Sequence, residues 1–192
     1  MQKLDENKRE AILTTAARLF AERPYHEVRL DDVAAEAHVG KGTVYLYFDC
    51  KQDLYRCVVL DGFDRLLARL SSHMSPGRHK DAWGTFTALV GELVAWAKAY
   101  PHAFSLMRSA DEAAPRPEHV ARRKELARLI EQVIRRGVAS GEFEDPRPDL
   151  TAQFLPAAVR ATLKFGPARV STDTLCEHLV RVIGGGIRRK VS

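Results

Sequence analysis

The sequence predicts an all-α protein with two helical domains, one at residues 1–50 and a larger one at residues 51–192. Three observations lead to this prediction. Apolar residues recur every three or four positions along most of the chain, no segment alternates apolar and polar residues as a half-buried strand does, and proline and glycine fall mainly between the periodic segments. With 192 residues, 45% of them hydrophobic, the chain can bury a substantial core.

The first domain is expected to hold three helices, at residues 5–21, 30–37 and 41–47. In the first helix Ile12, Ala16 and Leu19 share one face, and Pro24 ends the pattern because proline disrupts a helix interior. Val44 and Phe48 are the expected anchors of the third helix on the core of this domain.

The rest of the chain is expected to hold six helices, at residues 51–72, 80–99, 101–110, 117–140, 150–165 and 172–187. Gly141 is predicted to cap one of them at its C-terminal end, where glycine is common. Residues 145–148 contain two prolines and are expected to be an extended linker. Pro156 falls inside a helical pattern, so that helix should kink or begin later than residue 150.

The net charge of +5 is distributed unevenly along the chain. Residues 1–50 carry 7 Lys and Arg against 9 Asp and Glu, whereas residues 51–192 carry 23 against 16. The N-terminal domain is therefore not basic as a whole. A role in binding nucleic acid would depend on where single cations lie rather than on bulk charge.

Composition and spacing disfavour several other classes of protein. No apolar run approaches the roughly 20 residues that span a bilayer, and the N-terminus lacks the apolar segment of a signal peptide. We therefore expect a cytoplasmic protein with no membrane partner. Cys50, Cys57 and Cys176 and the seven histidines lack metal-ligand spacing, so we expect reduced thiols, no metal and no cofactor.

Two short helices joined by a tight turn, at residues 30–37 and 41–47, predict a helix-turn-helix whose second helix can enter the major groove of DNA. Four side chains of that second helix can donate hydrogen bonds to phosphates or base edges: Lys41, Thr43, Tyr45 and Tyr47. Because Tyr45 and Tyr47 are two residues apart, they cannot share one buried helix face, and at least one should be exposed.

A set of apolar, aromatic and polar residues recurs around this motif: Ile12, Leu13, Ala16, Ala17, Leu19, Phe20, Tyr25, Val28, Asp32, Val33, Ala34, Ala37, Val39, Lys41, Gly42, Thr43, Val44, Tyr45, Tyr47, Phe48, Lys51 and Leu54. In this order and spacing, residues 9–56 resemble the N-terminal domain of the TetR (AcrR-type) family of transcriptional regulators. Residues 137–143 also look like a stretch that many members carry before their last two helices. The resemblance implies an all-helical homodimer that binds a palindromic operator in double-stranded DNA, usually represses transcription, and releases DNA when a small molecule enters the larger domain.

By this resemblance, seven positions are expected to bind DNA: Arg29, Lys41, Gly42, Thr43, Tyr45, Tyr47 and Lys51. Lys41 and Thr43 would face base edges or nearby phosphates, while the two tyrosines would hold phosphates. Lys51, at the start of the fourth helix, would hold another phosphate with its side chain and with the free backbone N–H groups there.

Three places depart from the usual family pattern. His38 stands where a turn glycine is common, at a backbone position that often needs a positive φ. Gly40 replaces the usual Ser or Ala before the recognition helix, so a side-chain cap is missing. Arg29 and Cys50 stand where small hydroxyl residues often cap helices, and Arg29 could reach a phosphate instead.

Large apolar residues in the later helices have two interpretations. At helical spacing they usually form a core, but the resemblance implies that some line a ligand pocket, since bundle interiors hold ligands with a few polar groups for orientation. The pocket candidates are Phe63, Trp83, Phe86, Trp96, Phe104 and Met107, with Arg160 as a polar partner. The expected effector is a small apolar or amphipathic molecule.

The last two helices are expected to form the dimer surface. The candidate interface residues are Phe154, Ala158, Leu175, Leu179, Val182 and Ile183. The alternative is an intramolecular core, and both can hold. Residues 184–186 are three glycines, each of which weakens a helix by about 1 kcal/mol relative to alanine, which indicates either fraying or close approach of the backbone to a partner.

Other functions are less well supported. No nucleophile, base and orienting residue occur in a catalytic pattern, and no Gly-rich phosphate loop is present, so we do not expect an enzyme. A helical protein-interaction module, or a regulator without a small-molecule inducer, remains the alternative. Salt-dependent binding to a palindromic duplex would separate the interaction module from the regulator.

Overall fold

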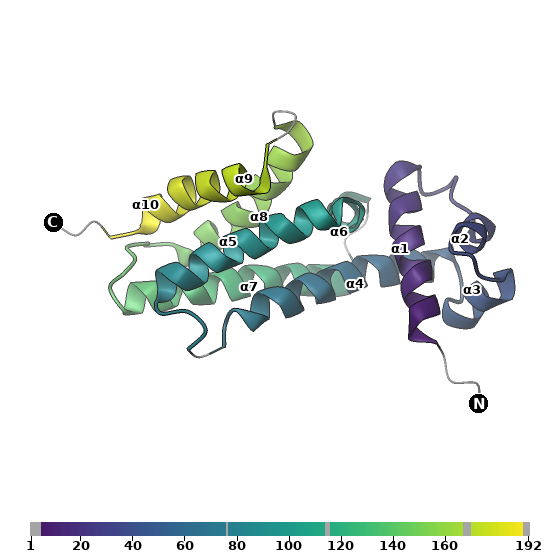
Figure 1. Ribbon diagram of the computed structural model, residues 1–192, viewed down its shortest axis with the longest axis horizontal. Helices are drawn as coiled ribbons and strands as arrows, with labels where there is room; N and C mark the ends of the chain where they lie inside the picture. Colours follow the sequence, from purple (N-terminus) through teal and green to yellow (C-terminus); the bar gives the residue numbers. More distant parts are fainter. Residues whose placement is uncertain (1–4, 76, 114–115, 167–169, 190–192) are drawn as a thin grey trace. The chain divides into compact units, whose positions relative to one another are not determined.

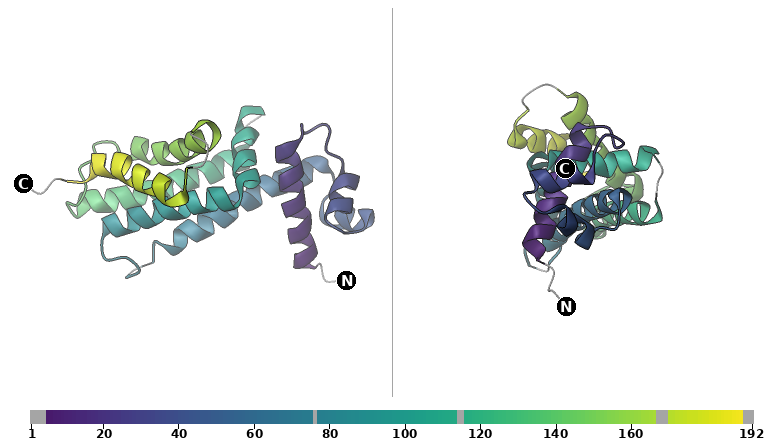
Figure 2. Two further views of the ribbon diagram at one scale, coloured as in Figure 1. Left: turned by 45° about the horizontal axis from the view of Figure 1, so that its top comes forward. Right: turned by 90° about the vertical axis from the view of Figure 1, so that its right-hand side faces the viewer.

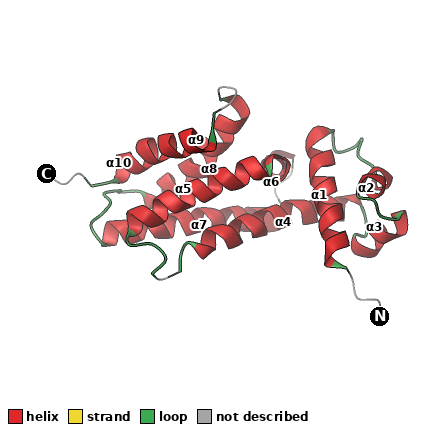
Figure 3. Ribbon diagram, viewed as in Figure 1, coloured by secondary structure: helices red, strands yellow, loops and turns green. Residues whose placement is uncertain are grey.

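The computed structural model describes residues 5–75, 77–113, 116–166 and 170–189, and most of them are helical (Figure 1). The helices are α1 (Glu6–Glu22), α2 (Leu30–Glu36), α3 (Lys41–Tyr47), α4 (Lys51–Ser72), α5 (Ala82–Ala99), α6 (Pro101–Ala113), α7 (Pro117–Ala139), α8 (Pro148–Phe165), α9 (Thr172–Leu179), the π-helical segment η1 (Val180–Gly184) and α10 (Gly185–Ile187). Over these described residues there is no strand, and one isolated bridge joins Phe143 to Arg188 (Figure 3). The all-α prediction is confirmed, and α3 and α4 have the bounds expected from the sequence.

Packing divides the chain into two compact units. Unit 1 contains the residues up to Asp64 together with Tyr100–Val120, and unit 2 contains Arg65–Ala99 and the residues from Ala121 onward. This division differs from the expected boundary at residue 50, because the beginning of α4 and the whole of α6 pack with the N-terminal helices.

The core of unit 1 lies where α1, α2 and α3 meet. Ile12, Ala16 and Leu19 of α1 are fully buried, as predicted, and so are Val33 of α2 and Val44 of α3. A seven-residue helix such as α3 is too short to be stable alone, so its place depends on these contacts.

The contact of α6 with α4 completes unit 1. A Cβ added at Gly62 of α4 would lie 3.3 Å from Met107 Sδ and 3.6 Å from the Ala103 Cβ, so α6 lies close against this part of α4. Three of the pocket candidates, Phe63, Phe104 and Met107, are buried within unit 1. A role for them in ligand binding stays a prediction.

Unit 2 is built around α5, most of whose residues are apolar. The C-terminal helices (yellow) run alongside α5 in Figure 2. Helix α5 packs against α8 and α9, and Arg136 of α7 donates a hydrogen bond of 2.7 Å to Thr85 Oγ1 on α5. Phe86 and Trp96, which are pocket candidates, are almost completely buried on α5. A helix this rich in apolar residues is expected at the centre of a bundle.

The residues expected at the dimer surface differ in burial within the chain. Leu175 and Leu179 are only 3% and 5% exposed, because α9 turns this face toward α5 within unit 2. They belong to the core of their own chain, which is the alternative that the sequence left open, and a dimer contact for them stays a prediction. Of the other candidates, Phe154 and Val182 are well exposed, whereas Ala158 and Ile183 are half-buried.

Residues 137–143, singled out in the sequence, form the connection after α7. A Cβ at Gly137 would lie 2.2 Å from the Phe143 ring, so glycine is needed there to admit the phenyl group. Gly141 has a φ of 76°, which confirms it as the left-handed residue that ends α7. Phe143 then packs edge-on against Trp83 and Phe86 of α5.

Glu142 ties the same connection to the start of α5. Its carboxylate accepts hydrogen bonds from the backbone N–H groups of Ala82 (3.2 Å) and Trp83 (3.1 Å), and from the Ser140 hydroxyl (2.7 Å). Burial raises the pKa of Glu142, but these hydrogen bonds outweigh it and hold the pKa below its ordinary value. The side chain thus caps α5 from a residue distant in sequence.

Two expectations about α8 are wrong: that Pro148 belongs to a linker, and that the helix containing Pro156 begins after residue 150. Pro148 is the first residue of α8 rather than part of a linker. Proline fits there because the N–H groups of the first helical turn make no hydrogen bond within the helix. Pro156 lies inside α8, which begins earlier, not later, than the sequence indicated.

Of the three glycines near the C-terminus, Gly184 lies where the packing of the chain leaves no room for a side chain. It is buried, and an added Cβ would lie 2.8 Å from Phe86 Cε1 and 3.0 Å from the Trp83 ring. Gly185 and Gly186 have no atom within 4 Å of such a Cβ. Gly184 therefore makes the close backbone approach expected from the sequence, and it makes this approach to α5 of the same chain.

We predict that Gly184→Ala lowers the free energy of unfolding by about 1–3 kcal/mol, because the aromatic rings of α5 must move to admit the methyl group. Gly91→Ala is the matched control: it is also a helical glycine, but no atom lies within 4 Å of its added Cβ. Chemical denaturation of both variants measures the difference. Equal stabilities for the two variants would contradict this packing.

Candidate nucleic-acid interface

The turn between α2 and α3 fixes the angle at which α3 leaves the core. The N–H of Val39 donates to the Ala34 carbonyl at 3.0 Å, and that of His38 donates to Ala35 at 3.2 Å. His38 has a φ of 54°, the one positive φ at a non-glycine among the described residues. The expectation for this turn position is confirmed, and histidine occupies a backbone conformation that most side chains avoid.

Helix α3 begins after Gly40, which provides no side-chain cap, as predicted. Its inner face is anchored by Val44, which is fully buried, and by Phe48 just beyond its end. On the outer side Tyr45 is 48% exposed and Leu46 is 59% exposed. The expectation that at least one of the two tyrosines would be exposed is met by Tyr45, while Tyr47 is half-buried.

Lys41, the first residue of α3, is held by a carboxylate of α2. Its ammonium lies 2.8 Å from Asp31 Oδ1 and donates a hydrogen bond of 2.9 Å to Oδ2. The hydrogen bond and charge of Asp31 raise the pKa of Lys41. Both side chains are exposed, so a DNA phosphate or base can compete with Asp31 for the lysine.

In the free protein the Tyr47 hydroxyl already has partners, and its role as a phosphate ligand stays a prediction. Its hydroxyl donates to the Asp5 carbonyl at 2.9 Å and accepts from the Asp5 N–H at 2.8 Å. These bonds join the end of α3 to the start of α1, so the hydroxyl is engaged in the fold.

The Lys51 side chain also has partners in the free protein, and its phosphate contact stays a prediction. An ammonium has three donors, and all of them are directed at carbonyl groups of the segment before α2: Tyr25 at 2.9 Å, His26 at 3.3 Å and Val28 at 3.0 Å. The ammonium also lies 4.5 Å from the centre of the Tyr25 ring. Lys51 therefore fastens the loop between α1 and α2 to α4.

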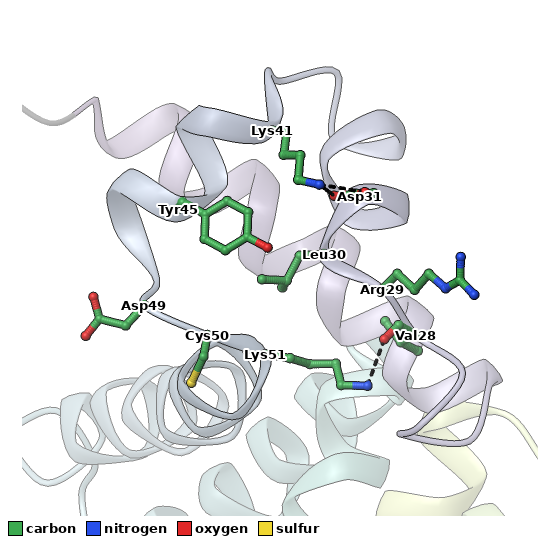
Figure 4. A pocket seen from close by; sticks show the side chains of 9 residues that line it. All are labelled: Val28, Arg29, Leu30, Asp31, Lys41, Tyr45, Asp49, Cys50 and Lys51. Carbon is green, nitrogen blue, oxygen red and sulfur yellow. Dashed lines mark hydrogen bonds and ion pairs between the residues drawn. The ribbon is translucent and has the colours of Figure 1, made fainter.

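An open groove of about 370 Å³ runs along this face of unit 1 (Figure 4). It is lined by Val28, Arg29, Leu30, Asp31, Lys41, Tyr45, Asp49, Cys50 and Lys51. Four of the seven expected DNA-binding residues therefore line one surface, whereas Gly42, Thr43 and Tyr47 lie outside the lining.

The groove contains both cations and carboxylates. Figure 4 shows Lys41 reaching Asp31 and Lys51 reaching Val28, with the Arg29 guanidinium directed away from both. The backbone N–H of Arg29 bonds to Asp32 at 3.3 Å, so the acidic residue caps α2 and leaves the exposed arginine side chain available. The carboxylates of Asp31 and Asp49 oppose an approaching phosphate, so binding requires the cations to outweigh them.

Comparison with known proteins agrees with this geometry. Residues 12–58 match the model for "Bacterial regulatory proteins, tetR family", and residues 80–164 match "Tetracyclin repressor-like, C-terminal domain". The chain belongs to the TetR family. It is accordingly a DNA-binding transcription regulator of the helix-turn-helix type, a class that does not consist of enzymes.

Full-length relatives support the family assignment. The helix-turn-helix transcriptional repressor KstR2 of Mycolicibacterium smegmatis is 25% identical over 196 residues, covering 94% of this chain and 91% of KstR2. The structure of the fatty acid degradation regulator FadR from Bacillus halodurans has a TM-score of 0.78 at 21% identity, covering 99% of this chain and 100% of FadR. AibR in complex with isovaleryl coenzyme A and operator DNA has a TM-score of 0.75 at 18% identity, covering 91% of this chain and 96% of AibR.

Two other properties of the TetR-family chain concern membranes and metals. Among the described residues, no helix has the length and apolar character needed to cross a membrane. Within the same part of the chain, no group of three or more His, Cys, Asp or Glu side chains is placed to hold a metal ion.

We predict that Asp31→Asn raises the affinity for duplex DNA by about two- to fivefold at low salt, because it frees Lys41 from an exposed ion pair and removes a negative charge. Asp49→Asn is the matched control, since it removes the same charge from the same groove but leaves the Lys41 pair intact. Fluorescence anisotropy across a salt series measures both. If Asp49→Asn gives an equal gain, the competition for Lys41 is refuted.

Proposed function

We propose that this TetR-family regulator is a homodimeric repressor that binds a palindromic operator and releases it when a small molecule enters the helices that follow residue 50. The observation that supports it most is α3, a helix fastened by Val44 and Phe48 with its opposite face exposed. Two such helices enter successive major grooves when they lie about 34–36 Å apart. A palindromic sequence is then read by the same residues in each half-site.

The exposed face of α8 supports a dimer through unit 2. Phe154, Ala158, Ala161 and Phe165 are spaced by four, three and four residues and so share one face of this helix. Phe154 is 57% exposed and Phe165 is 76% exposed. An exposed apolar stripe of this kind favours a partner, and Val182 near the end of the chain adds an exposed apolar side chain to the same proposal.

For the effector, we propose a coenzyme A thioester of a small acid. The proposal draws on AibR, whose structure contains isovaleryl coenzyme A, and on the fatty acid function in the name of FadR. In this chain the aromatic side chains of α5, Trp83, Phe86 and Trp96, are the candidates to contact an acyl chain, and Arg160 is the candidate to contact a phosphate. A ligand can lower DNA affinity only by binding the DNA-free conformation more tightly.

The operator is tested by selecting bound sequences from a random duplex pool. We expect a palindrome, bound by two copies of the chain. Phe154→Glu should leave the fold intact, because the side chain is exposed, but should weaken dimerisation and lower operator affinity at least about tenfold by placing two carboxylates in the interface.

Sedimentation and gel shift measure the two effects. Gln153→Glu is the control, since it adds a charge at an exposed position next to Phe154 and off the apolar stripe. A wild-type monomer at micromolar concentration, or a selected sequence without symmetry, would overturn the dimeric proposal.

The effector is tested by adding coenzyme A thioesters of increasing chain length to the operator complex. We expect one range of chain lengths to release the DNA, while free coenzyme A and the free acids leave it bound. Retention of DNA with every thioester would refute this effector class and favour a regulator without such an inducer.

A further inference from the structure

We propose that Leu46, together with Gly42, reads the C5-methyl group of a thymine in each half-site. This inference rests on the proposed function, because it requires α3 to lie in the major groove. It assigns a role in sequence specificity to Leu46, which is not among the seven residues expected to bind DNA.

The position of Val44 determines which residues form the outer ridge of α3. Val44 is fully buried, and positions 42 and 46 lie two residues to either side, on the opposite face of the helix. They are four residues apart and therefore neighbours on that face. Gly42 and Leu46 form the part of α3 farthest from the core.

In the described part of the chain, packing does not require glycine at position 42. No atom lies within 4 Å of a Cβ added there, so a side chain would fit, yet glycine weakens a helix. Without a side chain, the backbone at this end of the ridge can approach base edges closely. Leu46 then becomes the side chain that projects farthest into the groove.

Leu46 is also the most exposed large hydrophobic residue of unit 1 within the described residues, at 59% against 48% for Tyr45. The polar groups nearest to the ridge are partly engaged in the free protein, since Lys41 pairs with Asp31 and the Tyr47 hydroxyl bonds to Asp5. The ridge formed by Gly42 and Leu46 presents an apolar surface.

The chemistry of the major groove limits what such a surface can recognise. Thymine carries the one apolar group that base pairs expose there, whereas the other positions present hydrogen-bond donors and acceptors. A leucine packed against those polar groups would displace the water bound to them without forming hydrogen bonds in its place, which costs free energy. The arrangement of Lys41, Tyr45 and Leu46 thus fits a thymine beside polar contacts.

The test uses the operator obtained by selection, with each thymine replaced in turn by deoxyuridine, which lacks only the methyl group. We expect wild-type affinity to fall about fourfold at one symmetric pair of positions for each methyl lost, as expected for one buried methyl group. Leu46→Ala should bind the thymine and uracil operators equally at that pair. Val138→Ala, which shortens an exposed apolar side chain of α7, should keep the wild-type difference.

The outcomes separate this inference from the proposed function. If the wild-type protein selects an operator but no thymine-to-uracil change alters its affinity, the role of Leu46 is refuted while DNA binding stands. The same holds if Leu46→Ala retains the full difference, since another group then reads the methyl. If the protein selects no sequence at all, the proposed function itself fails.

Discussion

The burial of Val44 and Phe48 is the constraint on which the DNA-binding surface depends. Helix α3 has seven residues, no side-chain cap at Gly40 and a glycine within it, so little in its own sequence stabilises it. Two apolar contacts with the core hold it in place. Because those contacts fix one face inward, they also decide that Gly42, Tyr45 and Leu46 face outward.

Around this anchor, several polar groups are already paired in the free protein. Tyr47 joins the end of α3 to the start of α1, and Lys51 joins the start of α4 to the loop before α2. Lys41 pairs with Asp31 through an exposed contact that DNA can replace. The groove thus offers DNA the exposed Arg29 side chain and Lys41, whose pairing with Asp31 a phosphate can replace.

The sequence predicted the helices well because their signals are local. Proline at residue 24, the periodic apolar residues and the glycine at residue 141 each mark an element from within a few neighbours. The contacts that were missed join distant segments: Lys51 reaches carbonyls more than 20 residues away, and Gly184 meets aromatic rings of α5. For Leu175 and Leu179 the sequence left a dimer contact and an intramolecular core open, since periodicity shows that a face is apolar but not what covers it.

Cys50 allows a direct measurement of which face meets DNA. It is a free, exposed thiol that lines the groove beside Lys41 and Tyr45, whereas burial raises the pKa of Cys57 and of Cys176 and makes them less reactive. A DNA-cleaving iron chelate attached to Cys50 should cut the selected operator at two positions related by its symmetry. Uncut or randomly cut DNA, with the labelled protein still bound, would contradict the account.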